Sequence, residues 1–527
     1  MLFNNWVENR TLDCQLSFKN QSPSIEEFVS IKLGLWIWSS GSDQPKDAHV
    51  AITINDLKDF TLEIARNVAW SGVGVRLGKS AISAMRASRD RFETLIEDPE
   101  LTIYGVTSGY GQNAKTRLTK EQRKAHAKQP PTAPATSWGD PLPDRVTRAI
   151  IFARLANFVE GHAAISPPIA EAVAAMLNAP KQPTIPARGQ GGAGEILSLS
   201  HLFLPMLETV EPAEKDVLSL INGSPAATGL VTDAALAAQR RIKTAAEVLV
   251  LAAEAFDAPL EHFDPALDNL WNNPHDASAL AQIRDLLAGT NTINRRPYQA
   301  PVSFRILPRI LGQAHLAASQ AEMVARDSLG AVSDNPVVLA ADAHHPNGRA
   351  ISTGGYHNAQ APMVMDQITA AYANLAIIAE RMSAKLLDEG IALKSLGPEA
   401  MSTANRGYLG CLPMAAAGYA EEARALATAT LLPGSESGGF GANDVASPVF
   451  AAWSKQERAG VLLESTLAAL APIAVRGFDV TDRPPPPALE ELASLIRETV
   501  PDEAGATLLG PATGALAKAL RERIYAA

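Results

Sequence analysis

Side chains able to do acid–base and carboxylate chemistry lie in Gly-rich loops. Tyr104 and Tyr110 belong to the Gly-framed segment YGVTSGYG, and a phenol of pKa ~10 acts as a base only where its site stabilises the phenolate. Arg305 offers a planar donor fork that suits a carboxylate, although an Arg can equally bond the carbonyls at a helix end. Asn222 and Gln299 carry amides that either orient a substrate or only satisfy loop backbone. These residue types indicate chemistry on a small carboxylate.

A second Gly-rich segment, Gly189–Gly194 (GQGGAG), matches the G-x-G-x-x-G pattern of dinucleotide-binding proteins. That interpretation needs a preceding strand, and Pro183 and Pro186 interrupt the approach. The chain also has no G-x-S-x-G or H-E-x-x-H pattern. The segment is therefore interpreted as a loop, and the sequence indicates no metal or diffusible cofactor.

Long helices must position these loops. From Thr53 onward the chain is rich in Ala and Leu, and apolar residues recur at helical spacing, whereas strand-like runs are few and short. Long helices with small residues on several faces favour a bundle over a layered sheet. The stretch 295–312 is expected to be a loop. Helices are expected at Asp144–Glu160, Pro168–Leu177, Ala234–Asp257, Pro362–Asp388, Met414–Leu431 and Ala451–Pro472.

The predicted organisation has four parts. Residues 1–48 form an N-terminal extension with little helical pattern, and residues 49–230 form an N-terminal domain that holds both Gly-rich segments. Residues 231–480 form a central helical bundle. Residues 481–527 form a C-terminal helical tail, which follows the stiff break RPPPP.

Composition excludes several classes of function. The chain has 46 Lys and Arg against 56 Asp and Glu, a net charge of −10, and a nucleic-acid binder needs clustered basic residues. The early apolar stretch IKLGLWIW is far shorter than the ~20 residues that span a bilayer, and it lacks the flanks of a signal peptide. Two cysteines are too few for a disulfide framework. We therefore expect a cytoplasmic protein that acts on a small molecule, with no nucleic-acid or membrane partner.

Several motifs, in order, resemble the aromatic amino acid lyase family, which holds the histidine, phenylalanine and tyrosine ammonia-lyases and related aminomutases. Tyr104–Gly111 looks like the family's YGxNTGFG segment, Asn222-Gly223 like its Asn-Gly-Thr, and Ser333–Pro336 like its Ser/Thr-Asp-Asn-Pro. The resemblance runs from about Thr53 to about Pro472. It implies an all-α fold of the ammonia-lyase (aspartase-like) type, with a smaller loop-rich N-terminal region. It also implies a homotetramer whose active sites are built from three subunits.

The chain departs from the family's pattern at three places. In the family, an Ala-Ser-Gly triplet cyclises into an electrophilic methylidene-imidazolone group, and the resemblance puts Gly192-Ala193-Gly194 on that triplet. Ala193 has no hydroxyl to lose, so the electrophile is not expected to form. The family's second active-site Tyr falls on Val302, and the Glu of its Asn-Gln-Glu-Asp motif falls on Asn443.

The retained residues imply an elimination. By resemblance, Tyr104 is the general base that takes the β-proton, Asn222 is a second catalytic residue, and Arg305 holds the substrate carboxylate. Without the electrophile, a leaving group that departs readily is needed, and a trimethylammonium group leaves as a neutral amine. An ergothionase-like release of trimethylamine from an aromatic or imidazole betaine is the leading hypothesis. Residues expected to bind the substrate, including aromatic walls around a quaternary cation, are Gln299, Asn335, Tyr110, Phe304 and Tyr356.

Two alternatives stay open. The changes at Val302 and Asn443 also fit a catalytically inactive homologue that keeps a ligand pocket as a binding or scaffold protein. The other alternative is a conventional ammonia-lyase acting on histidine or an aromatic amino acid, which the missing hydroxyl disfavours.

Overall fold

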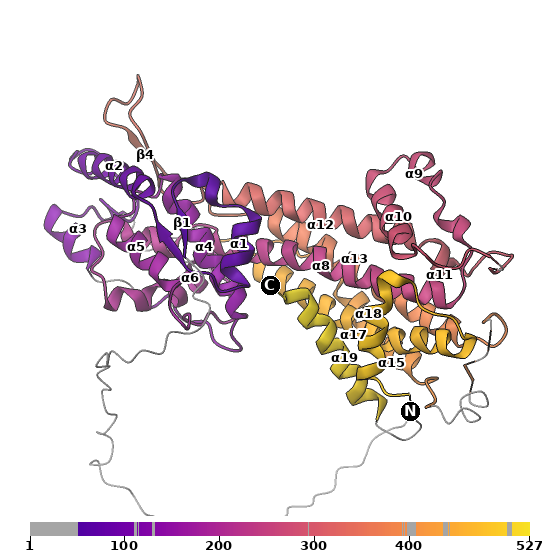
Figure 1. Ribbon diagram of the computed structural model, residues 1–527. Helices are drawn as coiled ribbons and strands as arrows, with labels where there is room; N and C mark the ends of the chain where they lie inside the picture. Colours follow the sequence, from indigo (N-terminus) through magenta and orange to yellow (C-terminus); the bar gives the residue numbers. More distant parts are fainter. Residues whose placement is uncertain are drawn as a thin grey trace, which may run out of the picture. The chain divides into compact units, whose positions relative to one another are not determined.

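The computed structural model describes residues 51–109, 113, 115–128, 132–293, 295–392, 394, 396–397, 407–435, 441, 443–502 and 508–526. The predicted extension 1–48 and Tyr110 lie outside this part of the chain. Within it the fold is almost entirely helical, as predicted (Figure 1). The strands form two small pairs: β1 (Ile52–Ile54) runs parallel to β2 (Val75–Leu77), and β3 (Val337–Leu339) runs antiparallel to β4 (Arg349–Ile351).

Long helices run side by side through the molecule and pack on one another: α8 lies against α4, α12 and α17, and α13 lies against α12, α15 and α17 (Figure 1). The helix α8 is buried on nearly all sides, as its Ala-rich sequence permits. These helices are α4 (Asp144–Glu160), α8 (Pro225–Ala255), α12 (Leu307–Leu329), α13 (Gln360–Leu386), α15 (Leu412–Leu426) and α17 (Val449–Thr481).

Shorter helices lie at the two ends of the long ones. Their starts follow local rules, since Thr61 and Thr119 cap α1 and α3 with side-chain oxygens and Asn273 caps α10. At one end lie α1 (Leu62–Ala69), α2 (Lys79–Leu95), α3 (Lys120–Ala127), α5 (Pro167–Met176), α6 (Ile196–Phe203) and α7 (Asp216–Ile221). The others are α9 (Leu267–Leu270), α10 (Pro274–Leu286), α11 (Val302–Arg305), α18 (Glu490–Thr499) and α19 (Leu509–Tyr525).

Several predicted boundaries are corrected. The expected loop at 295–312 is wrong, because α11 and the start of α12 fall inside it. The helix expected to end at Pro472 continues to Thr481. Proline removes one backbone hydrogen bond, but the residues that follow it, from Ile473 to Phe478, are buried and keep the helix packed.

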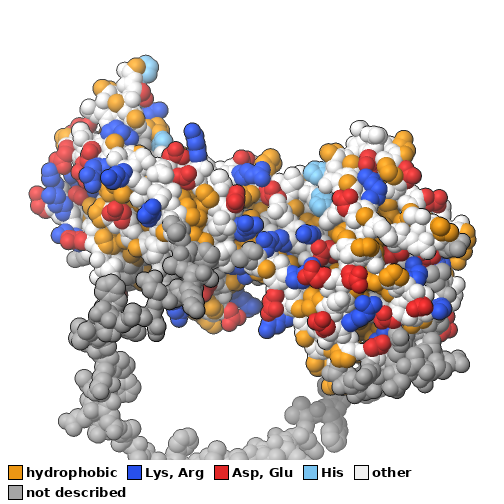
Figure 2. Space-filling model, viewed as in Figure 1, with side chains coloured by type: hydrophobic (Ala, Val, Ile, Leu, Met, Phe, Trp, Pro, Cys, Tyr) orange, Lys and Arg blue, Asp and Glu red, His pale blue; other side chains and the backbone are white. Residues whose placement is uncertain are grey.

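By length and composition alone, α17 could cross a membrane, because an 18-residue window in it has a mean hydropathy of 1.5. However, 89% of that window is buried inside the molecule. Its apolar character is therefore explained by its central place in the bundle. On the face drawn in Figure 2, basic and acidic side chains are interspersed and form no single basic field.

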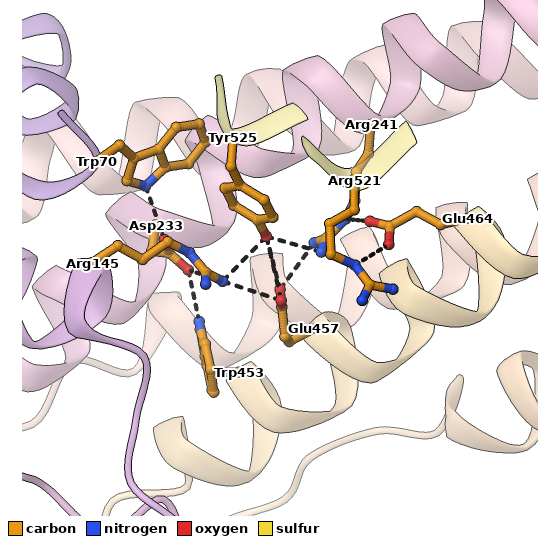
Figure 3. A network of polar contacts seen from close by, with 9 residues as sticks. All are labelled: Trp70, Arg145, Asp233, Arg241, Trp453, Glu457, Glu464, Arg521 and Tyr525. Carbon is orange, nitrogen blue, oxygen red and sulfur yellow. Dashed lines mark hydrogen bonds and ion pairs between the residues drawn. The ribbon is translucent and has the colours of Figure 1, made fainter. Parts of the chain in front are cut away.

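Buried charges tie α4, α8, α17 and α19 together (Figure 3). Arg241 donates to Glu464 (2.8 Å), Glu457 (3.0 Å) and the Tyr525 hydroxyl (2.9 Å). Arg145 donates to Asp233 (2.9 Å) and Glu457 (3.1 Å). We call this set the bundle network; its members are Trp70, Arg145, Asp233, Arg241, Trp453, Glu457, Glu464, Arg521 and Tyr525.

Candidate active site

The Gly-rich segment ends in two consecutive left-handed residues, Gly194 (φ 61°, ψ 24°) and Glu195 (φ 58°, ψ 20°). A non-Gly residue in this conformation costs about 1–2 kcal/mol. The buried Glu195 carboxyl group offsets that cost, since its two oxygens accept hydrogen bonds from the amides of Ala226 (2.6 Å) and Ala227 (2.8 Å) in the first turn of α8. Burial raises the pKa of Glu195 to about 8, against the influence of these two amides. The triplet Gly192-Ala193-Gly194 is thus fixed to the N-terminus of α8.

Asn222, the residue that ends α7, lies against this triplet. A Cβ placed on Gly194 would be 3.0 Å from Asn222 Oδ1 and 3.5 Å from Cδ2 of Tyr356. The structure therefore brings Gly194, Asn222 and Tyr356 together. Asn222 Oδ1 is buried and has no hydrogen-bond partner within the described part of the chain, so it is available to accept one.

A fully buried guanidinium, that of Arg154, contacts the backbone of Asn222. Arg154 of α4 donates through Nη2 to the Asn222 carbonyl oxygen (2.5 Å), and its Nη1 lies 3.4 Å from Asp334 Oδ1. Burial lowers the pKa of Arg154 and raises that of Asp334. Arg154 Nε and Asp334 Oδ2 are buried without partners among the described residues. We call Arg154, Asp334 and Asn222 the loop cluster.

Asn335, next to Asp334, organises the loop that carries Tyr356. Its Oδ1 accepts hydrogen bonds from the Thr353 amide (2.9 Å) and the Ser352 hydroxyl (3.2 Å). In this structure Asn335 therefore holds one loop of the site in place, and the predicted role in substrate binding stays a prediction.

Tyr104 is half-buried in a turn that packs against the start of α7. Its neighbours Gly105 and Val106 line a small cavity of about 20 Å³ together with Lys215, the residue before α7. Lys215 Nζ donates to the Ala163 carbonyl (2.6 Å), and burial lowers the pKa of Lys215 to about 8. The Tyr104 turn and Asn222 thus lie at opposite ends of the same six-residue helix.

Asn443 is exposed, and its segment adjoins the Gly-rich loop. The neighbouring Asp444 carbonyl accepts from the Ser435 amide (3.0 Å), and the Ser435 hydroxyl donates to the Gly191 carbonyl (3.2 Å). A cavity of about 540 Å³ opens there, within the size range of small-molecule sites. It is lined by residues 187–191 of the loop and by Thr430, Leu431, Pro433, Ser447, Pro448, Phe450, Ala451 and Ser454.

Arg305 and its neighbours lie far from this site within one chain. Phe304 stacks on Phe256, which ends α8, with ring centroids 4.4 Å apart, whereas Glu195 caps the other end of α8. A helix of 31 residues is roughly 45 Å long. Figure 1 shows α11 and α6 at opposite ends of the long helices. A single chain therefore does not bring Arg305 to the triplet, and Phe304, which is fully buried, forms no wall of a pocket.

The other predicted residues at this far end are exposed. Gln299 faces solvent, and Val302 is 56% exposed. Arg305 Nε donates to the Ala300 carbonyl (2.9 Å), which is the backbone role that an isolated Arg can have. Sequence reasoning missed Arg154, and the signal was present as one Arg inside the apolar run AIIFARLANFV. Among the described residues, no group of three or more His, Cys, Asp or Glu is placed to hold a metal ion.

The long-helix bundle, with its Gly-rich loop and amide at one end, defines a helical protein of the ammonia-lyase and aminomutase type. The sequence model described as "Aromatic amino acid lyase" matches residues 60–498. The chain therefore belongs to the aromatic amino acid lyase family.

Curated relatives are histidine ammonia-lyases. That of Streptomyces avermitilis is 29% identical over 352 residues, which cover 61% of this chain and 67% of the relative. That of Salmonella paratyphi B is 29% identical over 386 residues, which cover 67% and 74%.

Solved structures share the fold. A tyrosine aminomutase from Streptomyces globisporus has a TM-score of 0.79 at 22% identity, covering 90% of this chain and 98% of that one. Ergothionase, an ergothioneine-degrading enzyme from Treponema denticola, has a TM-score of 0.79 at 17% identity, covering 90% and 100%.

Proposed function

We propose that this protein is a carbon–nitrogen lyase that works without the methylidene-imidazolone electrophile. The observation that carries the proposal is Ala193, which stands where the resemblance requires a Ser whose hydroxyl is lost as water. The triplet ends in a left-handed turn that places Gly194 against Asn222. The site would therefore keep its shape without the group that activates a poor leaving amine.

The proposed substrate is a carboxylate-bearing aromatic or imidazole betaine. Tyr104 takes the β-proton, the electrons of that C–H bond form the Cα=Cβ double bond, and the C–N bond breaks. Trimethylamine leaves as a neutral molecule, and an unsaturated acid remains. The positive charge on the trimethylammonium group makes the amine a good leaving group, which is the role of the electrophile in the family. This activation lowers the barrier by several kcal/mol, and each 1.4 kcal/mol is about tenfold in rate.

Arg305 is proposed to bind the substrate carboxylate in a site that another copy of the chain completes. The roughly 45 Å length of α8 separates Arg305 from Ala193 within one chain, so the two residues can meet only across an interface. Because Gln299 and Val302 are exposed beside Arg305, this end of the molecule is free to make such an interface. We propose a homotetramer with shared active sites.

The test is incubation of the full-length protein with ergothioneine, hercynine and related betaines while ultraviolet absorbance of an unsaturated acid is followed. Tyr104→Phe should lower turnover by about 100- to 10,000-fold. Mass spectrometry of the peptide that contains Ala193 should show no loss of water. A dehydrated, ring-closed peptide, or rapid ammonia release from histidine or phenylalanine, would support a conventional ammonia-lyase instead.

A non-catalytic binding protein is the second candidate. The exposed Val302 and Asn443, where the resemblance expects a Tyr and a Glu, favour it. In that case Tyr104→Phe would leave ligand affinity unchanged, and no betaine would be consumed by the wild-type protein.

A further inference from the structure

Trp138 is an exposed aromatic side chain in a segment tied to the Gly-rich loop. Its side chain is 85% exposed, which is unusual because Trp is large and mostly buried in folded proteins. The segment is held in place by the Ser137 hydroxyl, which donates to the Gly189 carbonyl (2.9 Å), and by the Ala187 amide, which donates to the Asp140 carbonyl (2.9 Å). These two hydrogen bonds hold the segment against the Gly-rich loop, so the exposed indole lies beside that loop.

A cavity of about 500 Å³ opens in front of this segment. Arg188 and Gly189 line it, and the same two residues also line the 540 Å³ cavity beside the Gly-rich loop. The two cavities therefore adjoin at these residues, and the second extends along the loop as far as Gly191, two residues before Ala193. The lining is Thr136, Ser137, Trp138, Gly139, Asp140, Arg188 and Gly189.

The lining combines three kinds of recognition in one cavity. The face of an indole attracts a quaternary ammonium group, and the exposed carboxylate of Asp140 adds a second attraction for the cation. The Arg188 guanidinium is a planar fork for a carboxylate. No hydrogen bond or ion pair joins the side chains of Asp140 and Arg188 to another residue in the described ranges.

We propose that Trp138, Asp140 and Arg188 form an entrance subsite for a small zwitterion that carries both a quaternary ammonium group and a carboxylate. The proposal rests on the proposed function for the type of ligand, and it names a place for that ligand outside the reacting centre. It also gives the cation an aromatic partner, which the buried Phe304 does not provide.

Tryptophan fluorescence of the full-length protein tests the subsite directly. An exposed indole emits at long wavelength, and a ligand over its face should quench the emission in a saturable way. The probes are hercynine, which carries both charges, tetramethylammonium, which carries only the cation, and trimethylacetate, which carries only the carboxylate. Kd values of the variants are measured by isothermal titration calorimetry, which does not depend on the indole that is removed. Trp138→Leu should raise the Kd for hercynine about 3- to 30-fold, whereas the control Trp271→Phe should not change it.

Two further variants separate the charges. Asp140→Asn should weaken binding of hercynine and tetramethylammonium but not of trimethylacetate. Arg188→Gln should weaken binding of hercynine and trimethylacetate but not of tetramethylammonium. The emission of Trp138 is obtained as the difference between the spectra of the wild type and Trp138→Leu, because the chain has 7 Trp residues. If Trp138→Leu leaves all three Kd values unchanged, or if that difference spectrum is the one of a buried indole because a second copy covers Trp138, the subsite proposal is wrong.

The same variants distinguish this proposal from the proposed function. Binding that follows the charge pattern, without consumption of any betaine, would leave the subsite standing and overturn the lyase proposal. If the wild-type protein consumes a betaine and Trp138→Leu has the same kcat/KM, the lyase proposal stands and the subsite proposal is wrong.

Discussion

The bundle network and the loop cluster each contain an Arg of α4, Arg145 and Arg154, but they differ in how completely their buried polar atoms are paired. None of the nine side chains of the bundle network has a buried nitrogen or oxygen without a partner. In the loop cluster, Arg154 Nε, Asp334 Oδ2 and Asn222 Oδ1 all lack one within the described residues. A satisfied network makes a structure rigid, whereas orphaned buried atoms mark a place where a water, a ligand or another chain supplies the partner.

Burial also has opposite effects on the carboxyls of the two regions. Burial alone would raise the pKa of Glu457, but Arg241 and Arg145 outweigh it and bring that pKa to about 2. For Asp334 burial dominates and raises the pKa despite Arg154. The bundle network therefore stabilises the ionised form of Glu457, whereas the loop cluster disfavours the ionised form of Asp334. Groups with pKa values shifted in this way are typical of functional sites.

Removal of Arg241 should have the largest effect on stability. Arg241→Met leaves Glu457 and Glu464 without their main buried partner, and breaking a buried ion pair from one side costs about 3–5 kcal/mol. Denaturant unfolding should show this loss, while turnover per folded molecule stays unchanged. The control Arg424→Met removes an exposed pair with Glu421 and should leave the melting temperature as it is. Equal losses in the two variants would contradict the role given to the bundle network.

Arg154→Lys should instead lower turnover. Lysine keeps the charge but loses the planar fork that bonds the Asn222 carbonyl, a charged hydrogen bond worth about 1.5–3 kcal/mol. If this energy is realised at the site, kcat should fall about 10- to 100-fold. The matched control is Arg148→Lys in the same helix, because within the described part of the chain Arg148 donates to backbone carbonyls alone, those of Val68, Leu177 and Val73.

Both lysine variants should lose similar stability, so a comparable fall in turnover would show that Arg154 has no special connection to the site. A crystal structure of Arg154→Lys gives a measurement independent of activity, in which the Asn222 side chain should shift relative to Gly194. An unmoved Asn222 would contradict the positioning role even if no substrate is found.

The sequence predicted α4 with the observed bounds and α13 within two residues, because apolar positions at helical spacing cover both. It placed the start of α8 nine residues late, at Ala234. The missing part, PAATGLVTD, contains Gly and Thr, which have weak helical preference, and it is helical because it is buried against α4.

The site was predictable only in part, for a geometric reason. The motifs named Asn222 and the Gly-rich triplet as parts of one site, but sequence order cannot show that α8 separates the triplet from Arg305. Arg154 lay inside a helix that was interpreted as core, and Trp138 lay in a loop without a motif. Their roles depend on contacts between distant segments, which spacing along the chain does not reveal.

The pH dependence of stability should separate the two regions. The folded pKa of Glu457 lies below its ordinary value of 4.5, so its stabilising contribution is present above about pH 4.5 and is lost as the pH falls toward 2. The folded pKa of Glu195 is raised to about 8, so its contribution is present below about pH 4.5 and is lost as the pH rises through 8. Melting temperatures against pH should therefore flatten between about pH 2 and 4.5 in Glu457→Gln and between about pH 4.5 and 8 in Glu195→Gln. Identical pH profiles of the melting temperature in the two variants would contradict the opposite pKa shifts given to Glu457 and Glu195.

The smallest effect is expected at Gly194. Alanine there must adopt a left-handed conformation that costs about 1–2 kcal/mol, and its Cβ would meet Asn222 Oδ1 at 3.0 Å. The control Gly418→Ala lies in α15 with open space around it and should raise the free energy of unfolding by about 0.5–1 kcal/mol. Gly194 lies against Asn222 of the loop cluster, whereas the bundle network has no member next to Asn222. Gly194→Ala should therefore lower turnover by more than its small loss of stability explains. If turnover falls only in proportion to the folded fraction, the contact between Gly194 and Asn222 has no functional role of its own, and it does not distinguish the loop cluster from the bundle network.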